Sequence, residues 1–492
     1  MSEAHLDVDI ETSPRSRSER FVTLARSAGW SAQRSSPWWC MALAALLIVL
    51  PNWPGRINND TVGMLQQIDR HRISNWHSPL LQYLYLPVRE LGGGIAPAFV
   101  VTFLVGFAGL LLIFENFGIS RLKSSLLALG VCLFPVTYGL LSSVTRDAWF
   151  MALWLLALGI TRTHRIRGAR RFGVLFAVLF FVYSARQNGI VIALPLFAAA
   201  LWDPAWAATR RWRWWLKGLA AAGASAAIVL VMSLVLMLLP IRKENPEAVT
   251  YLFDLIRLSV RNDEMLLPPE LNPFDLSVDF LKENTTAVRL DDVVYRRDRM
   301  HVRLDDPEAQ LARDTWLDFV TDDPVEYLRM RWQMMTYQIG LGGNTRNTFI
   351  GGMIDNPYGI QPAFPGAFAA ATDYQLSFGG GSSGEAGVVH RVWPVLLLSV
   401  VAVGAALTRR RGAPYAVDAF VSSVLVMALL FFVAPQVHFR YMSPIYVVLG
   451  IACLGLTWPW RDQRTARDDE AEDDFGAVPA ELESERSLTD AG

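Results

Sequence analysis

Residues 216–240 read LKGLAAAGASAAIVLVMSLVLMLLP, and this stretch decides the fold class. No charged residue occurs between Lys217 and Arg242. A membrane-spanning helix needs about 20 apolar residues to cross the hydrocarbon core, so the stretch is long enough to span a bilayer. The whole chain is 52% hydrophobic, which is close to the ~45–50% of soluble domains. The separation of apolar stretches by charge clusters is therefore more informative than the composition.

Further apolar stretches predict an all-α integral membrane protein with about ten transmembrane helices. The predicted spans are Pro37–Trp53, Ile95–Phe114, Ser124–Ser143, Ala148–Ile160, Phe172–Tyr183, Gly189–Trp202, Leu216–Pro240, Val392–Thr408, Ala419–Pro435 and Tyr441–Trp460. The interval Phe172–Trp202 is interrupted by Arg186, Gln187 and Asn188. A charged side chain at mid-membrane costs at least about 2.5 kcal/mol. We therefore interpret this interval as two short helices, with a re-entrant hairpin as the alternative.

The basic residues indicate the orientation of the predicted spans. They cluster in alternate loops, at residues 121–123, 162–171, 210–217 and 409–411, whereas most of the opposite loops contain few. Cytoplasmic loops are enriched in Lys and Arg, so this alternation predicts that both termini lie in the cytoplasm.

The predicted spans divide the chain into five parts. These are a cytoplasmic tail 1–36, a transmembrane module 37–240 with a first outer loop 55–94, an extracytoplasmic loop or domain 241–391 between spans seven and eight, the last helices 392–460, and an acidic cytoplasmic tail 461–492. Both tails are polar and predicted to be disordered. The first outer loop contains an apolar run, Leu80–Leu86, that resembles an interfacial helix.

The large outer loop contains a predicted helix at Thr321–Gln338. Asp323 suits the N-cap, Pro324 suits the first helical position, and Glu326 would complete a capping box. We interpret the adjacent aspartates at 305–306 and 322–323 as helix caps in preference to metal ligands. The stretch Gly340–Gly387 is rich in Gly and Asn and predicts a flexible loop, with a mobile cover over a membrane-facing site as the alternative.

Several classes of function lack support in the sequence. Cys40, Cys132 and Cys453 lie inside apolar stretches, which indicates buried thiols and neither a disulfide framework nor a metal site. The formal net charge is −1, so bulk charge does not favour a nucleic-acid partner. The motifs of P-loop nucleotide hydrolases and HExxH zinc proteases do not occur.

Five polar clusters lie at the predicted outer ends of the spans. They are Arg56-Ile-Asn58-Asn59-Asp60, Trp76-His77-Ser78-Pro79, Thr145-Arg146-Asp147, Arg186-Gln187-Asn188-Gly189 and His438-Phe439-Arg440-Tyr441. Each alone could be a turn, a helix cap, a local ion pair or an interfacial anchor. Together they would place two carboxylates, two histidines and four arginines at one water–lipid boundary. Carboxylates can accept a proton or hold a divalent cation, and arginine binds phosphate in bidentate geometry.

The order of these features resembles the GT-C superfamily of polytopic glycosyltransferases, which use polyprenyl-phosphate-linked sugars at the outer face of the membrane. The chain is also similar to uncharacterised bacterial membrane proteins grouped with that superfamily. The resemblance covers roughly Pro37–Trp460. It rests on Asn58-Asn59-Asp60, His77-Ser78-Pro79, Asp147, Arg440-Tyr441-Met442-Ser443-Pro444 and, in the large outer loop, Trp316…Asp323-Pro324-Val325-Glu326-Tyr327-Leu328-x-x-Arg331.

The resemblance implies roles for individual residues. Asp60 resembles the catalytic base that activates the acceptor, and Asp147 resembles the second acidic residue, used for acceptor positioning or for a metal. Arg186 and Arg440 resemble ligands of the lipid phosphate. The remaining candidates are Tyr441 and His438 for the lipid phosphate, and Arg146, His77, Asn59 and Asn188 for donor or acceptor binding.

The resemblance also implies partners and a location. The expected partners are a polyprenyl-phosphate sugar donor, an envelope glycan, lipid or protein acceptor, and the bilayer of the bacterial cytoplasmic membrane; no nucleic acid is expected. A divalent cation, Mg²⁺ or Mn²⁺, would be held by Asp60 and Asp147, but Asn58 occupies the position where an Asp-x-Asp motif would have its first carboxylate. Metal dependence therefore stays open.

Two rival functions remain. A transporter or flippase of lipid-linked sugars would need charged residues deep within several spans, and perhaps an internal repeat. A non-enzymatic membrane scaffold built around the large loop would give Asp60, Asp147 and Arg440 no common purpose.

Overall fold

The computed structural model describes residues 35–457 except 164, 203–205, 287–289, 291–292, 294–303, 343–352, 380–386 and 410–413. Both predicted disordered tails lie outside the described residues, apart from residues 35–36, which begin the first helix. Within the described part of the chain all regular secondary structure is helical. The all-α prediction is therefore confirmed for these residues.

Four helices are long and apolar enough to cross a membrane: α4 (Ala96–Glu115), α8 (Gly168–Ala185), α11 (Trp214–Met237) and α19 (Pro414–Val433). A fifth is present if the bent pair α5 (Arg121–Leu133) and α6 (Pro135–Leu141) forms one span. Other predicted spans coincide with shorter helices, namely Ser35–Val49, α7 (Arg146–Arg162), α9 (Ile190–Leu201), α18 (Val392–Arg409) and α20 (Phe439–Thr457). A multi-pass membrane protein fits this pattern, and the count of ten spans stays a prediction.

The predicted span Ser124–Ser143 coincides with the bent pair α5 and α6. The chain bends by 82° between α5 and α6. Phe134 takes an extended conformation, with a ψ of 133°, and Pro135 begins α6. A proline ring disfavours helical backbone at the residue before it and lacks the N–H that would continue the helix, so the break follows from Pro135.

The interval Phe172–Trp202 forms two helices, α8 and α9, as both two short spans and a re-entrant hairpin would require. They are joined at Arg186 and the short turn η2 (Gln187–Gly189), and Arg186 itself has extended backbone. Arg186 therefore lies at the break and not within a helix.

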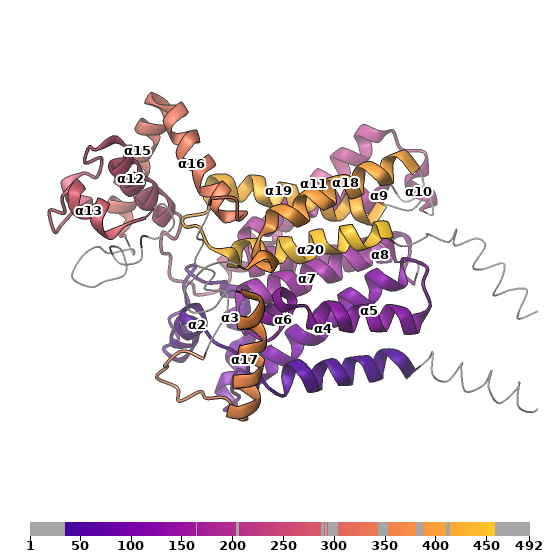
Figure 1. The fold of residues 1–492 in the computed structure, drawn as a ribbon. Coiled ribbons are helices and arrows are strands. Elements are labelled where there is room, and N and C mark those ends of the chain that lie inside the picture. The colour runs from indigo at the N-terminus through magenta and orange to yellow at the C-terminus, as the bar shows by residue number, and fades with distance from the viewer. Residues whose placement is uncertain are drawn as a thin grey trace, which may run out of the picture.

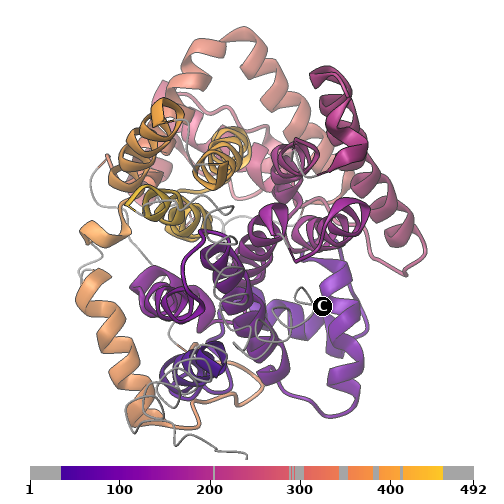
Figure 2. The same ribbon diagram turned by 90° about the vertical axis from the view of Figure 1, so that its right-hand side faces the viewer.

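Helix α7 lies at the centre of the bundle and packs against α4, α8, α9, α19 and α20 (Figure 2). Glycines allow α4 to approach it closely. A Cβ atom at Gly109 would lie 2.6 Å from the backbone nitrogen of Leu156, and one at Gly159 would lie 2.8 Å from Leu112 Cβ. Small residues at such contacts let helix backbones pack tightly, which is the usual solution inside membranes.

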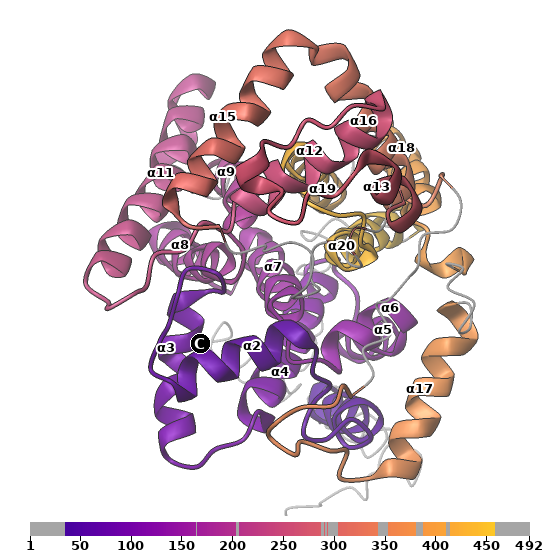
Figure 3. The same ribbon diagram turned by 90° about the vertical axis from the view of Figure 1, so that its left-hand side faces the viewer.

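One end of the bundle has the two outer regions of the chain (Figures 1 and 3). The first region contains α2 (Asn59–Asp69) and α3 (Pro79–Glu90), so the predicted interfacial run is helical. The second contains α12 (Ala248–Asn262), α13 (Val278–Asn284), α15 (Asp306–Asp322) and α16 (Pro324–Gln338). These four helices are called here the α12–α16 subdomain. Helices α12, α13 and α15 share a hydrophobic core that includes Leu252, Phe253 and Ile256, and α16 packs beside Leu258 of α12 through Tyr327 and Met330.

Each of the two aspartate pairs at 305–306 and 322–323 contains a helix cap, as predicted. Asp305 caps α15 and forms a complete capping box with Glu308. Asp323 caps α16 by accepting a hydrogen bond from the backbone N–H of Glu326 at 3.0 Å. The Glu326 carboxylate instead pairs with Arg261 at 2.6 Å.

The stretch Gly340–Gly387 is more than the flexible loop that was predicted, because its described part includes the helix α17 (Pro365–Gly379). Before this helix, Met353, Ile354 and Tyr358 pack against the hydrophobic cluster around Ile57 of the first outer loop. Residues 343–352 and 380–386 of this stretch lie outside the described residues. Side-chain packing, which composition does not reveal, orders the part that is described.

Candidate functional site

The starts of α2 and α7 lie side by side, and each has a carboxylate in its first turn. Asn58 caps α2 and Thr145 caps α7. The hydroxyl of Thr61 donates to the backbone carbonyl of Val144 at 2.5 Å, which ties one helix start to the other. Asp60 and Asp147 therefore occupy neighbouring helix N-termini, where the helix dipoles favour negative charge.

Three arginines surround these carboxylates. Asp60 contacts Arg440 at 2.8 Å and Arg146 at 3.7 Å, whereas Asp147 pairs with Arg186. The neighbours Arg146 and Asp147 thus pair with different partners, and the local ion pair considered from the sequence is not formed. Residues from four distant segments are joined in one network.

The pKa of the Asp60 carboxyl lies well below its usual range. Burial raises this pKa, but the positive charges of Arg440 and Arg146, with smaller contributions from His77 and Arg186, lower it by more. Favourable charges that stabilise the ionised form have this effect. Asp60 is therefore a carboxylate at any physiological pH.

Aromatic and imidazole rings complete the network. The Tyr441 ring lies 4.9 Å from the Arg186 guanidinium and 5.1 Å from that of Arg440, within the range of cation–π attraction. His438 approaches the same ring edge-on, with centroids 6.1 Å apart. His77 lies against Gly63, where a Cβ atom would be 3.0 Å from its Nε2 atom. A glycine at this position leaves room for the imidazole.

Three guanidinium groups keep donors that the fold does not use. The Nε atoms of Arg146, Arg186 and Arg440 are buried and have no hydrogen-bond partner among the described residues. Leaving a buried donor unsatisfied costs about 1–3 kcal/mol, and more for a charged group. This cluster therefore favours an additional acceptor, and an anion would be the strongest one.

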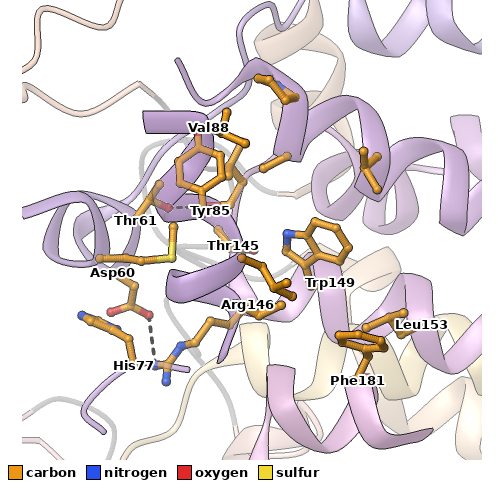
Figure 4. A pocket seen from close by; sticks show the side chains of 17 residues that line it. Asp60, Thr61, His77, Tyr85, Val88, Thr145, Arg146, Trp149, Leu153 and Phe181 are labelled. Carbon is orange, nitrogen blue, oxygen red and sulfur yellow. Dashed lines mark hydrogen bonds and ion pairs between the residues drawn. The ribbon is translucent and has the colours of Figure 1, made fainter. Parts of the chain in front are cut away.

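An apolar groove of about 330 Å³ begins at this network (Figure 4). Asp60, His77 and Arg146 form its polar end, and Trp149, Leu153 and Phe181 lie away from that end. The groove is lined by Asp60, Thr61, Met64, His77, Leu81, Leu84, Tyr85, Val88, Pro97, Ala98, Val101, Val144, Thr145, Arg146, Trp149, Leu153 and Phe181.

A second, more polar pocket of about 280 Å³ adjoins the groove. Arg186, Asn188 and Tyr441 line it together with Val433, Ala434 and Pro435 at the end of α19. His77 and Arg146 line both cavities. An amphiphilic ligand could therefore place its apolar part in the groove and its polar part in the pocket, with the charged network between them.

The structure brings together most of the site residues predicted from the sequence. Asp60, Asp147, His77, Arg146, Arg186, Asn188, Arg440, Tyr441 and His438 belong to the network or line its pockets.

Two residues lie elsewhere. Asn59 is exposed at the first position of α2 and lines neither cavity. Arg56 points toward α17, where it donates to Gln375 at 2.7 Å and to Thr372 at 3.2 Å.

Sequence reasoning missed the apolar wall of the groove. Leu81, Leu84 and Tyr85 belong to the predicted interfacial run, and their spacing places them on one face of α3. That spacing could have indicated the lining of the groove. No sequence feature marked Trp149 and Phe181 as lining residues, because aromatic residues are common in transmembrane helices.

The two carboxylates do not form a metal site by themselves. Within the described part of the chain no three His, Cys, Asp or Glu side chains gather where they could hold a metal ion. A cation between Asp60 and Asp147 would need further ligands from a substrate or from water.

Comparison of the chain with protein-family models, with curated proteins and with solved structures found no match. Function has to be inferred from the residues themselves.

Proposed function

We propose that this protein is a membrane glycosyltransferase of about ten spans, with both termini in the cytoplasm of a bacterial cell. It would move a sugar from a polyprenyl-phosphate-linked donor to an acceptor of the cell envelope at the outer face of the membrane. The observation that supports this proposal most is the meeting of the apolar groove and the polar pocket at Arg146, which together with Arg186 and Arg440 has an unused buried donor.

The charges of the network suit a lipid phosphate. Two carboxylates face three guanidinium groups, so the network has an excess of one positive charge. A polyprenyl-phosphate sugar is a phosphodiester with one negative charge, which would balance that excess. Its prenyl chain would lie in the groove, and its sugar and the acceptor would enter the polar pocket.

The reaction needs a base and a stabilised leaving group. The acceptor hydroxyl attacks the anomeric carbon, its proton passes to the Asp60 carboxylate, and the bond from the anomeric carbon to the phosphate oxygen breaks. The phosphate leaves with that electron pair and gains a second negative charge. Arginines that bind the doubly charged product more strongly than the donor would lower the barrier.

Asp60 is a weak base while it pairs with Arg440 and Arg146, because its pKa is low. The donor phosphate would compete for the same guanidinium groups. Such competition would raise the pKa of Asp60 when the donor is in place, so that the base becomes effective only in the loaded enzyme. Asp147, paired with Arg186 and 4% exposed, would position Arg186 and not react.

The experiment is a transfer assay with purified protein in lipid nanodiscs and a polyprenyl-phosphate sugar donor. Asp60→Asn should lower turnover by about 100- to 10,000-fold, the usual contribution of a positioned general base. Asp69→Asn is the control, because Asp69 lies on the same helix and pairs with Arg89 away from both cavities. Normal transfer by Asp60→Asn would remove Asp60 from the mechanism. Proteoliposomes that move the donor across the bilayer without transfer would favour the flippase.

A further inference from the structure

The backbone between α19 and α20 is held by side chains from a distant part of the chain. The carbonyl of Ala434 accepts from Arg331 Nη1 at 2.8 Å, and that of Pro435 accepts from Arg257 Nη1 at 2.7 Å. The Thr250 hydroxyl donates to the carbonyl of Val433 at 3.2 Å. All three donors belong to α12 or α16 of the α12–α16 subdomain.

A buried carboxylate gathers the two arginines. Asp254 is fully buried, pairs with Arg331 and lies 3.9 Å from Arg257. The Trp316 indole donates to Asp254 at 3.1 Å, and the Arg331 Nε atom donates to the Tyr327 hydroxyl at 3.0 Å. Trp316, Tyr327 and Arg331 are the residues of the outer-loop pattern in the sequence. In the fold, all three side chains belong to the cluster around Asp254.

The held segment belongs to the site. Val433, Ala434 and Pro435 line the polar pocket. Five residues after Pro435, Arg440 contacts Asp60 at 2.8 Å. Between them, Val437 is buried against Leu258, Tyr327 and neighbouring residues of the subdomain. The position of Arg440 therefore depends on a segment whose carbonyls are fixed from outside the membrane bundle.

We propose that Arg257 and Arg331, held by Asp254, are positioning residues that fix the α19–α20 connection and thereby hold Arg440 against Asp60. Neither arginine lines the groove or the polar pocket. The α12–α16 subdomain is then an external brace for Arg440. The exchange measurement below does not depend on the proposed function, whereas the binding measurement rests on it.

The test compares two arginines one turn apart on α12, in the full-length protein in nanodiscs. Arg257→Met removes a hydrogen bond to the connection and leaves Asp254 paired with Arg331. Arg261→Met is the matched control, because Arg261 also joins α12 to α16, through Glu326 at 2.6 Å, but donates to no carbonyl of the connection. Amide hydrogen exchange of residues 436–441 and the affinity for dodecyl phosphate are measured for both.

We expect Arg257→Met to speed exchange of residues 436–441 and weaken dodecyl phosphate binding, each by about 10- to 150-fold, the scale of one charge-assisted hydrogen bond. Arg261→Met should change neither, and Arg257→Lys should restore part of both. Equal exchange in Arg257→Met and Arg261→Met would overturn the positioning role. If Arg257→Met does not fold, Thr250→Val provides the same comparison. Failure of the wild type to bind dodecyl phosphate would overturn the anion site, and exchange would still decide the positioning role.

Discussion

Arg331 of the subdomain cluster and Arg440 of the site cluster use the same side chain in opposite ways. In the subdomain cluster, Arg331 is fully buried and all three of its nitrogens donate, to Tyr327, Ala434 and Asp254. In the site cluster, Arg440 is 26% exposed, and its buried Nε atom has no partner among the described residues. An arginine whose donors are used by the fold is structural, whereas one with a donor left over, next to a residue that lines a cavity as Tyr441 does, is available for a ligand.

The largest effect should come from the structural cluster. Arg331→Met leaves Asp254 as a buried charge without its main partner, and breaking a buried pair in this way costs about 3–5 kcal/mol. Thermal unfolding in detergent would measure the loss. Adding Asp254→Asn should recover part of it, since the unpaired charge is then gone. A melting temperature for Arg331→Met equal to that of the wild type would show that Arg331 does not stabilise the fold.

A smaller and different effect is expected at the site. Arg440→Lys keeps the positive charge but loses the planar fork that matches phosphate. We expect dodecyl phosphate affinity to fall about 10-fold, which corresponds to about 1.4 kcal/mol, with stability unchanged within about 0.5 kcal/mol. Titration calorimetry and thermal unfolding would measure the two quantities. Arg89→Lys is the control, because Arg89 pairs with Asp69 outside both cavities. A loss of stability without a loss of affinity would make Arg440 structural.

The smallest effect concerns pH. The pKa of Asp60 is lower in the folded protein than in the unfolded chain, so its contribution to stability is present above about pH 4 and is lost as pH falls through the folded pKa. Asp60→Asn should therefore lower stability at pH 7, by about 1 kcal/mol or less for a partly exposed pair. The difference should stay constant from pH 8 to pH 5 and shrink below pH 4. Melting temperatures of the wild type and of Asp60→Asn across this pH range would test the prediction. A stability difference that grows as pH falls would contradict the ion pairs of Asp60 with Arg440 and Arg146.

The sequence predicted which residues lie at the same end of the protein, but not which of them form ion pairs with each other. Span parity placed Asp60, Asp147, Arg186 and Arg440 at one end, because parity depends only on counting apolar stretches. Arg146 pairs with Asp60 and Asp147 pairs with Arg186, and these pairings depend on how α2 and α7 are rotated about their axes. Hydropathy does not contain that information.

Other features had no usable local signal. Arg56 lies at the end of a predicted span, as the site residues do. It nevertheless points toward Gln375 of α17. Asp254 lies in the middle of an amphipathic helix, with nothing in its neighbourhood to mark it as the centre of a cluster. The bend at Pro135 is the exception, since a proline inside an apolar stretch is visible in the sequence.

The bend between α5 and α6 has a consequence for the surrounding lipid. Helix α5 has 13 residues, which at 1.5 Å per residue is about 20 Å, well short of the ~30 Å hydrocarbon core. Where a hydrophobic segment is too short, the bilayer thins beside it or lipids with shorter acyl chains collect there. We therefore expect hydrophobic mismatch to be concentrated on this side of the protein, and short-chain lipids to form its local annulus.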